Sequence, residues 1–251
     1  MNNRSFLITG AGSGFGRATA LKLAAAGARL TLGDLNLATA TETAELARKA
    51  GGEARALALD VAEETSVAAF TEGALQAYGR IDGAFNSAGV LGPVGSMAEV
   101  SLADFERVMS VNVRGVWLCM QAQLRAMLKS SAPDGGYSIV NAASIAGLMG
   151  SPLLPAYSAS KHAVVGMTRA AARFYGKNRI RVNCVCPGPV DTPLAGPLFG
   201  SEQIREMMMA RQALPEFGKA EDVASLVVWL LSPAAAMVTG TPVRVDAGAL
   251  A

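Results

Sequence analysis

Tyr157 and Lys161 stand four residues apart in the run AYSASKHA, which covers residues 156–163. If this run is helical, residues i and i+4 lie on one face, and a phenol comes close to an ammonium group. A free tyrosine has a pKa of about 10 and is a poor acid or base at neutral pH. Because a nearby cation favours the phenolate, we expect Lys161 to lower the pKa of Tyr157 and prepare it for proton transfer.

A glycine-rich turn, TGAGSGFG over residues 9–16, follows the first apolar run and opens a helical pattern. Such a turn lets the backbone approach a pyrophosphate at a helix N-terminus, where free N–H groups and the helix dipole favour an anion. Its spacing, G-x3-G-x-G, differs from the common G-x-G-x-x-G, and glycine-rich turns occur in many α/β proteins. The position between a strand and a helix predicts a dinucleotide site here.

Asp34 stands at the end of the second apolar run, where a carboxylate can accept hydrogen bonds from an adenosine ribose. The same carboxylate would repel the 2′-phosphate of NADP. The next residues, Leu35, Asn36 and Leu37, include no arginine to reverse that preference, and Arg17 is the only basic residue near the glycine turn. We therefore predict NAD as the cofactor. An alternative interpretation makes Asp34 a helix N-cap or turn residue.

Short apolar runs alternate with longer helical patterns along the whole chain. Apolar runs without alternation suit strands buried on both faces, and the β-α-β order requires a parallel sheet. A β/α barrel has the same order, but the glycine turn favours a doubly wound Rossmann fold. We predict a single α/β domain, residues 1–251, with a mostly parallel seven-stranded sheet flanked by helices. The expected strands are residues 5–9, 28–34, 54–60, 82–88, 137–144, 180–186 and 242–246.

Two segments stand out from this order. The longest helical pattern covers residues 101–128, with Ser101 as its expected N-cap. Residues 193–218 contain several prolines and glycines around one short helical piece, and long connections of this kind are often lids. We expect this segment to cover the substrate. The apolar residues expected to line the substrate site are Val90, Leu91, Leu148, Met149, Leu153, Leu154, Leu194, Leu198 and Phe199.

Composition argues against several classes of protein. The net charge of +2 is too small to indicate a nucleic acid or an anionic membrane as a partner. Three cysteines and one histidine form neither a disulfide framework nor a metal site, so we expect buried thiols and a structural or exposed His162. The chain shows no signal-peptide pattern and no apolar run of about 18 residues. These features predict a soluble, cytoplasmic protein without a metal.

Several motifs stand in the order found in the short-chain dehydrogenase/reductase family, which the chain resembles over nearly its full length. A Y-x3-K pair alone is a common chance match, whereas an ordered set of motifs is not. Ser87 replaces the second asparagine of N-N-A-G, and Ala247 replaces a glycine of the closing T-G-x4-V-D-G-G. The matching segments are TGAGSGFG (9–16), Asp60-Val61, NSAG (86–89), Asn112 in VNVRG, Ser144 in NAASIAG, Tyr157 with Lys161, and PGPVDT (187–192).

The resemblance implies a catalytic role for Asn112, Ser144, Tyr157 and Lys161. Tyr157 would be the general acid/base, and Lys161 its partner and a ligand of the nicotinamide ribose. Ser144 would donate a hydrogen bond to the substrate oxygen, and the backbone of Asn112 would hold a water that links Lys161 to solvent. The residues implied to bind NAD are Gly10, Ser13, Gly14, Phe15, Gly16, Asp34, Asp60, Val61, Asn86, Ala88, Gly89, Tyr157, Lys161, Pro187, Gly188, Val190 and Thr192.

These assignments predict an NAD-dependent oxidoreductase that interconverts a secondary alcohol and a ketone, with an apolar or cyclic substrate. Two alternatives stay open. A 3-oxoacyl-thioester reductase would generally use NADPH, which Asp34 disfavours, and a catalytically silent dinucleotide-binding protein should lack one of the catalytic residues. The resemblance also implies a homotetramer, with one interface on helices 101–128 and 156–175 and another on helix 219–231 and the final strand.

Overall fold

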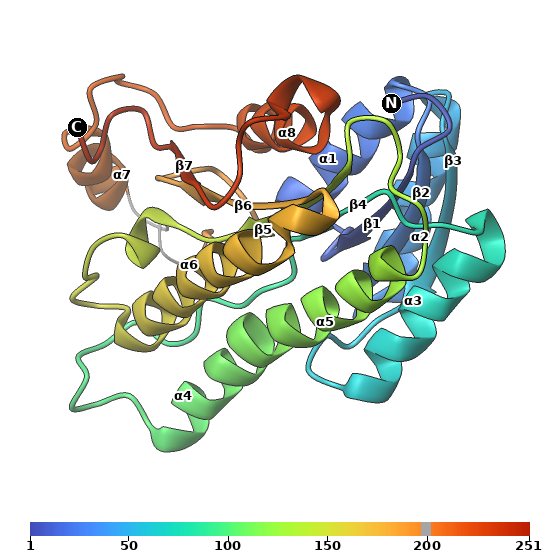
Figure 1. Cartoon of the computed structure of the whole chain (residues 1–251). Coiled ribbons are helices and arrows are strands. Elements are labelled where there is room, and N and C mark those ends of the chain that lie inside the picture. Colours follow the sequence, from blue (N-terminus) through green and yellow to red (C-terminus); the bar gives the residue numbers. More distant parts are fainter. Residues whose placement is uncertain (197–201) are drawn as a thin grey trace.

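A seven-stranded sheet forms the centre of the computed structural model, which describes residues 1–196 and 202–251 (Figure 1). Its strands lie in the order β3-β2-β1-β4-β5-β6-β7, and each neighbouring pair is parallel. The strands are β1 (Ser5–Thr9), β2 (Arg29–Asp34), β3 (Glu53–Ala58), β4 (Gly83–Asn86), β5 (Tyr137–Ala142), β6 (Ile180–Pro187) and β7 (Pro242–Val245). The predicted Rossmann-type sheet is confirmed, with strand ends that differ from the predicted ones by a residue or two.

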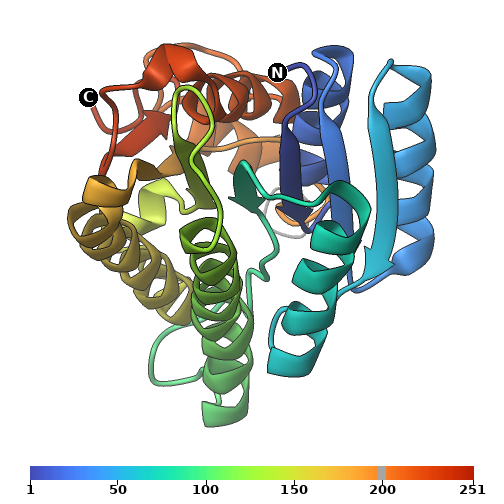
Figure 2. The same ribbon diagram turned by 45° about the vertical axis from the view of Figure 1, so that its right-hand side comes forward.

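Helices cover both faces of this sheet, and Figures 1 and 2 show the same two layers from different sides. One layer packs around Leu23, Leu30 and Val227, and the other around Phe70 and Met127, so each face of the sheet has its own apolar core. The first layer holds α1 (Gly14–Ala25), α2 (Leu37–Lys49) and α8 (Ala220–Leu231), and the second holds α3 (Glu64–Tyr78), α5 (Gly115–Leu128) and α6 (Pro155–Tyr175). Burial on both faces explains why the central strands are rich in apolar residues without a strict alternation of apolar and polar positions.

The strand order reverses between β1 and β4, because the chain returns from the edge strand β3 to pair with β1 on its other side. In sheets of this type, ligands bind in the crevice at the carboxyl ends of the strands where the order reverses. The glycine turn and the NSAG segment meet there. Thr9 Oγ1 accepts hydrogen bonds from the N–H groups of Ser87 and Ala88, each at 3.1 Å. The topology therefore joins two motifs that are far apart in the sequence.

The predicted helix over residues 101–128 is present but changes its winding near the middle. Ser101 caps α4 (Leu102–Met109) as predicted, since its Oγ accepts the N–H of Asp104 at 3.1 Å. A π-helical turn, Ser110–Arg114, then separates α4 from α5. Such turns are rare and occur frequently at functional sites. The buried Asn112 lies in this turn, although the apolar pattern of the sequence runs through it without a break.

The predicted lid segment contains one described helix, α7 (Glu202–Met209). Leu198 and Phe199, which we expected to line the substrate site, lie outside the described residues. The chain after α7 is tied to the C-terminal turn, because the N–H groups of Ala213 and Leu214 donate to the Ala247 carbonyl at 2.8 and 3.0 Å. Ala247 has a φ of +50°, in the left-handed region that favours glycine. This geometry explains why a glycine is the expected residue there.

Within residues 1–196 and 202–251, no helix is long and apolar enough to cross a bilayer. The same part of the chain holds no cluster of three or more histidine, cysteine, aspartate or glutamate side chains that could bind a metal. Cys119, Cys184 and Cys186 are free thiols with at most a few per cent of their surface exposed. The prediction that they serve as small buried hydrophobic residues is confirmed.

Candidate active site

Tyr157 and Lys161 lie in the first turns of α6, and Ser144 follows the end of β5. The Lys161 Nζ lies 5.4 Å from the centroid of the Tyr157 ring, so the spacing of four residues brings the pair together as predicted. The Ser144 hydroxyl lies close enough to the Tyr157 phenol to favour its ionised form, and its Oγ accepts the N–H of Ala146 at 3.1 Å. The three predicted catalytic side chains therefore form one polar cluster at the carboxyl edge of the sheet.

Desolvation, rather than the neighbouring ammonium group, dominates the ionisation of this pair. It raises the pKa of Tyr157 to about 12, and the hydrogen bond to Ser144 opposes that rise only in part. It also lowers the pKa of Lys161 to about 8. The pKa of Tyr157 in the chain alone therefore lies above its ordinary value and not below it as expected, because each charged form loses hydration in this site.

Lys161 points into the protein, where it is only 4% exposed and its Nζ donates to the Ala142 carbonyl at 2.8 Å. A Cβ atom added at Gly89 would lie 3.5 Å from this Nζ and 3.2 Å from the Asn112 Oδ1. The NSAG backbone therefore passes directly beside Lys161 and Asn112. His162, by contrast, is exposed, with its Nδ1 against a backbone carbonyl of its own helix, as expected of a residue without a catalytic role.

The side chain of Asn112 holds the segment that follows NSAG. Its Oδ1 accepts the N–H of Val90 and its Nδ2 donates to the Val90 carbonyl, both at 2.8 Å, and Nδ2 also donates to Ser160 Oγ at 3.0 Å. An amide is the natural side chain for this task because it can donate to and accept from one residue at once. Asn112 thus positions the loop beside Lys161. The water-holding role of its backbone stays a prediction.

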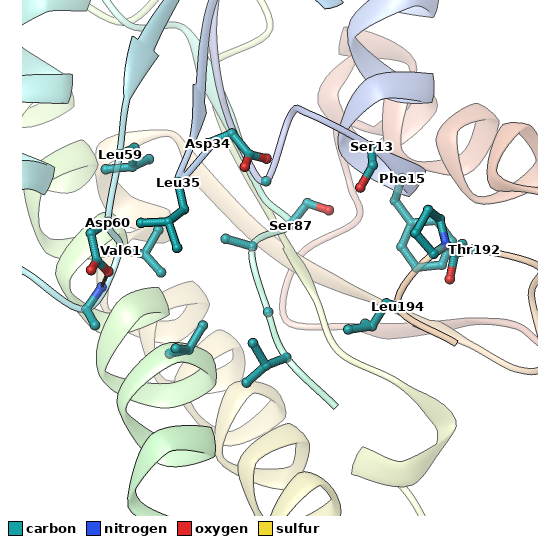
Figure 3. A pocket seen from close by; sticks show the side chains of 18 of the residues that line it. Ser13, Phe15, Asp34, Leu35, Leu59, Asp60, Val61, Ser87, Thr192 and Leu194 are labelled. Carbon is teal, nitrogen blue, oxygen red and sulfur yellow. Dashed lines mark hydrogen bonds between the residues drawn. The ribbon is translucent and has the colours of Figure 1, made fainter. Parts of the chain in front are cut away.

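A cavity of about 540 Å³ runs along the carboxyl ends of β1, β2 and β4 (Figure 3). Asp34 and Asp60 lie toward one side of it in this view, and Ser13, Phe15 and Thr192 toward the other. Its volume falls within the roughly 300–1,000 Å³ of sites that bind small molecules and cofactors. Of the predicted cofactor residues it gathers Gly10, Ser13, Gly14, Phe15, Asp34, Asp60, Val61, Ala88, Gly89 and Thr192.

The glycine turn beside this cavity fits a pyrophosphate. Gly10 has a φ of +65°, and a Cβ there would come within 2.8 Å of the Ala88 backbone. A Cβ at Gly16 would lie 2.2 Å from the Gly10 carbonyl oxygen, so Gly16 keeps the turn tight without lining the cavity. Ser13 and Gly14, at the start of α1, do line it. The free N–H groups and the dipole of this helix end favour a phosphate group.

Asn86 was predicted to bind the cofactor, but its side chain points away from the dinucleotide cavity. It is 1% exposed, and its amide exchanges hydrogen bonds of 3.1 and 2.7 Å with Gln123 and donates to Asn141 Oδ1 at 2.9 Å. Both the nitrogen and the oxygen of the Asn86 side-chain amide are therefore committed inside the protein. Its side chain braces β4 against β5 and α5 instead of lining the dinucleotide cavity.

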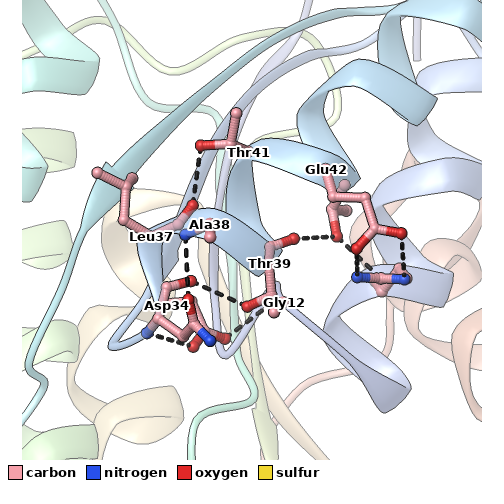
Figure 4. Close-up of polar contacts among 10 residues, drawn as sticks. Gly12, Asp34, Leu37, Ala38, Thr39, Thr41 and Glu42 are labelled. Carbon is pink, nitrogen blue, oxygen red and sulfur yellow. Dashed lines mark hydrogen bonds and ion pairs between the residues drawn. The ribbon is translucent and has the colours of Figure 1, made fainter.

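Asp34 points back toward the glycine turn (Figure 4). Its Oδ2 accepts the N–H of Gly12 at 2.8 Å, and its Oδ1 accepts the N–H of Asn36 at 3.0 Å. The N-cap of α2 is Asn36, so the interpretation of Asp34 as an N-cap is wrong, whereas its bond to the N–H two residues later fits the other alternative, a turn residue. A Cβ at Gly12 would lie 2.2 Å from Thr39 Oγ1 and 2.9 Å from Asp34 Oδ2. Sequence reasoning missed Gly12, whose lack of a side chain leaves room for the carboxylate.

Arg17, the basic residue nearest the glycine turn, is engaged with α2. Its Nε donates to Thr43 Oγ1 at 3.0 Å, and its guanidinium group forms an ion pair with Glu42 at 2.9 Å. Arg17 is not among the residues that line the dinucleotide cavity. Arg17 is therefore engaged elsewhere, and the arginine that does line this cavity is Arg107 of α4.

A smaller cavity of about 160 Å³ opens beside Tyr157 and Ser144. Phe15, Thr192 and Leu194 line both cavities, so the two adjoin. The predicted residues that line the smaller one are Leu91, Leu154, Leu194, Pro187, Gly188 and Val190, and those that line neither cavity are Leu148, Met149 and Leu153. Sequence reasoning missed Ile145 and Ser151. A carbon held against Tyr157 in this cavity lies next to the dinucleotide cavity, which is the arrangement that hydride transfer requires.

The sequence is similar to characterised enzymes over nearly its whole length. A family model described as enoyl-(acyl carrier protein) reductase matches residues 10–249. A 2,5-dichloro-2,5-cyclohexadiene-1,4-diol dehydrogenase of Sphingobium indicum is 39% identical over 250 residues, which cover 99% of this chain and 97% of that one. A cyclohexanol dehydrogenase of an Acinetobacter species is 40% identical over 245 residues, which cover 98% of this chain and 94% of that one.

Solved structures are similar to the same extent. The crystal structure of levodione reductase superposes with a TM-score of 0.93 at 34% identity, covering 98% of this chain and 97% of that one. A 3-ketoacyl-(acyl-carrier-protein) reductase of Brucella melitensis complexed with NADH gives 0.92 at 33% identity, covering 99% and 98%. A structure named as a 2-deoxy-d-gluconate 3-dehydrogenase of Agrobacterium tumefaciens, with bound NADP, gives 0.89 at 31% identity, covering 100% and 97%. Both forms of the nicotinamide cofactor thus occur among similar structures.

Proposed function

This chain belongs to the short-chain dehydrogenase/reductase family, and from that premise we propose that it is an NAD-dependent dehydrogenase of cyclic secondary alcohols. Membership makes it an oxidoreductase that acts on CH–OH groups with a nicotinamide dinucleotide. One observation carries the rest of the proposal. Tyr157 and Ser144 face a small apolar cavity that adjoins the dinucleotide cavity at Phe15, Thr192 and Leu194.

The catalytic side chains have separate tasks in this reaction. The bound dinucleotide supplies the acceptor for the hydride that leaves the alcohol carbon. Tyr157 accepts the hydroxyl proton during oxidation and returns it during reduction, and Ser144 donates a hydrogen bond to the substrate oxygen as negative charge builds there. Lys161, which is cationic at neutral pH with a pKa of about 8, offsets part of the cost of forming the phenolate of Tyr157.

The smaller cavity supports a compact, uncharged substrate. Its volume of about 160 Å³ is well below the roughly 300–1,000 Å³ of pockets for drug-sized ligands. Leu91, Ile145, Leu154 and Met208 make its walls largely apolar, and no arginine or lysine of the described chain lines it to bind a carboxylate. The two relatives described above are named for alcohols of six-membered rings. A 3-oxoacyl-thioester has less support because its long thioester chain fits so compact a cavity less well, although a similar reductase of that class is complexed with NADH.

The test is to measure NADH formation by its absorbance, with purified protein and a panel of alcohols. We expect kcat/KM to be higher for cyclohexanol than for 2-hexanol, because a ring fits the compact apolar cavity with less loss of conformational freedom. A 3-hydroxybutyryl thioester is the third substrate and tests the alternative, a 3-oxoacyl-thioester reductase. Failure to oxidise any cyclic alcohol, and to reduce the matching ketones with NADH, would contradict the proposal and favour the catalytically silent alternative.

We also propose that the protein is a homotetramer. Exposed apolar side chains lie on α4, α5 and α6, including Phe105, Trp117 and Phe174, and a hollow beside Phe105 and Trp117 is lined in part by Met167. A second apolar site lies on α8, where Trp229 is 42% exposed. Large exposed apolar patches mark sites of association. These two faces support the proposal, because they lie on the helices where the family resemblance implies the two interfaces.

Light scattering at micromolar concentration should therefore give four times the chain mass of 25.7 kDa. The variant Trp117→Glu should lower the mass to that of a dimer, because a charge would be buried at one of the two interfaces. Leu46→Glu on α2, outside both faces, is the matched control and should leave the tetramer intact. A wild-type monomer under these conditions would be incompatible with the proposal.

A further inference from the structure

Four hydroxyl groups belong to residues that line the substrate cavity, those of Ser144, Ser151, Tyr157 and Thr192. Ser144 and Tyr157 act on the reacting oxygen, and Thr192 is shared with the dinucleotide cavity. The mechanism gives no task to Ser151. Since pockets for small molecules are mostly apolar and use a few polar groups to orient their ligand, an additional hydroxyl in such a cavity is a candidate for substrate recognition.

The hydroxyl of Ser151 is not committed to the protein. Ser151 takes part in the fold through its backbone carbonyl, which accepts the N–H of Leu154 at 3.2 Å. Within residues 1–196 and 202–251, its side chain forms no hydrogen bond with another residue. The residue is half-buried, so the hydroxyl remains open to a ligand. Leaving it unpaired under an apolar ligand would cost free energy, whereas a ligand oxygen would satisfy it.

The loop that carries Ser151 is held at both ends. Ser158, buried on α6, donates its hydroxyl to the Ala146 carbonyl at 2.7 Å and contacts the Met149 carbonyl at 3.2 Å. On the other side, the Gly95 N–H donates to the Leu153 carbonyl at 2.9 Å. These contacts fix the backbone before and after Ser151. A hydroxyl on a fixed loop can select a ligand because little ordering is needed on binding.

The chemistry of the cavity narrows the ligand group to a neutral oxygen. A hydroxyl can donate to a carbonyl or exchange a hydrogen bond with an alcohol. A carboxylate or phosphate is disfavoured, because no lysine or arginine of the described chain lines this cavity and an unpaired charge among apolar walls is costly. In the proposed mechanism the reacting oxygen already takes the hydrogen bonds of Ser144 and Tyr157. The group at Ser151 must therefore be a second oxygen of the same substrate.

We propose that Ser151 is a specificity-determining residue that binds a second, non-reacting oxygen of the substrate ring, so that the preferred substrates are ring diols and hydroxyketones. This inference rests on the proposed function and makes its substrate class narrower. A plain ring alcohol fits the cavity but leaves Ser151 unpaired. A ring with a hydroxyl or keto group away from the reacting carbon satisfies it.

The experiment compares two substrates of similar shape, 1,4-cyclohexanediol and 4-methylcyclohexanol, in the wild-type enzyme and in Ser151→Ala. The wild type should prefer the diol, and Ser151→Ala should lower kcat/KM for the diol by roughly three- to tenfold, the effect of losing one neutral hydrogen bond. The value for 4-methylcyclohexanol should stay unchanged. Ser151→Thr, which keeps the hydroxyl, should keep the preference for the diol, and Ser130→Ala is the control for an exposed serine outside both cavities.

The outcomes separate the two proposals. Equal changes for both substrates in Ser151→Ala, or no change for either, overturn the role of Ser151 while the enzyme remains a cyclic-alcohol dehydrogenase. A wild-type enzyme that turns over neither substrate nor cyclohexanol overturns both proposals. NADH binding, followed by fluorescence, confirms that each variant is folded. If Ser151→Ala fails that test, loss of the diol preference in Ser151→Thr decides against the inference, and its retention supports it.

Discussion

The substitution Tyr157→Phe is expected to abolish turnover while cofactor binding survives. It removes one hydroxyl, the group that transfers the proton, and general acid/base catalysis contributes roughly a hundredfold to ten-thousandfold to the rate. Tyr157 is not among the residues that line the dinucleotide cavity. We therefore expect a single-turnover rate at least about a hundredfold below that of the wild type, together with an NADH affinity within a small factor of normal.

Tyr175→Phe provides the matched control for this prediction. Tyr175 is the last residue of the helix that carries Tyr157, and its ring packs edge-on against Phe174 with the centroids 4.9 Å apart. It lines neither cavity. Removing its hydroxyl should leave the single-turnover rate and NADH affinity unchanged. Near-normal turnover by Tyr157→Phe would show that another group moves the proton.

The sheet could be predicted from the sequence because its strands carry a local signal. Strands such as β5 and β6 are buried at every residue, and their sequences are correspondingly rich in apolar residues, with only a few polar ones among them. The tight glycine turn was predictable for a similar reason, since the Gly10 carbonyl leaves no room for a side chain at Gly16, six residues later. Both features depend on residues that are close together in the chain or on one repeated pattern.

Features that depend on distant segments could not be predicted in the same way. The Asn112 side chain hydrogen-bonds the backbone of Val90, which lies 22 positions earlier. The π-helical turn that contains Asn112 leaves the apolar periodicity of the sequence intact. Gly12 leaves room for Asp34 and Thr39, which follow it by more than 20 residues. No local pattern marks either contact. Both became visible only when the strand order brought those segments together.

Tyr157 and Lys161 show what the spacing of two residues can and cannot predict about a site. The interval of four residues between Tyr157 and Lys161 correctly predicted that they lie close together. It did not predict that the Lys161 Nζ donates to the Ala142 carbonyl, or that desolvation shifts both pKa values toward the neutral forms. Desolvation depends on every element that packs around the pair. The sequence therefore predicted which side chains lie together at this edge of the sheet but not the balance of their charges.

Choice of cofactor is the second large effect that we expect, and it depends on Asp34. Its carboxylate is fixed by the N–H groups of Gly12 and Asn36 and lines the dinucleotide cavity. It can receive hydrogen bonds from a ribose, but beside the 2′-phosphate of NADP it sets one negative charge against another of nearly two. Like charges in contact cost several kcal/mol. Arg17 cannot offset this from its place against Glu42 and Thr43 without first breaking those contacts.

We therefore expect kcat/KM with NAD to exceed that with NADP by roughly a hundredfold or more, since each 1.4 kcal/mol corresponds to about tenfold. Asp34→Ala should remove most of this preference. Because the variant also frees the N–H groups of Gly12 and Asn36, both cofactors should bind less tightly, and the ratio of the two kcat/KM values is the quantity to measure. Asp34→Asn, which keeps an oxygen acceptor but loses the charge, should reduce the ratio similarly with less loss of NAD affinity.

The control is Asp60→Ala. Asp60 lines the same cavity, and its substitution should leave the ratio of the two kcat/KM values unchanged. A wild-type preference for NADP, or a ratio that survives both Asp34 variants, would show that another group selects the cofactor.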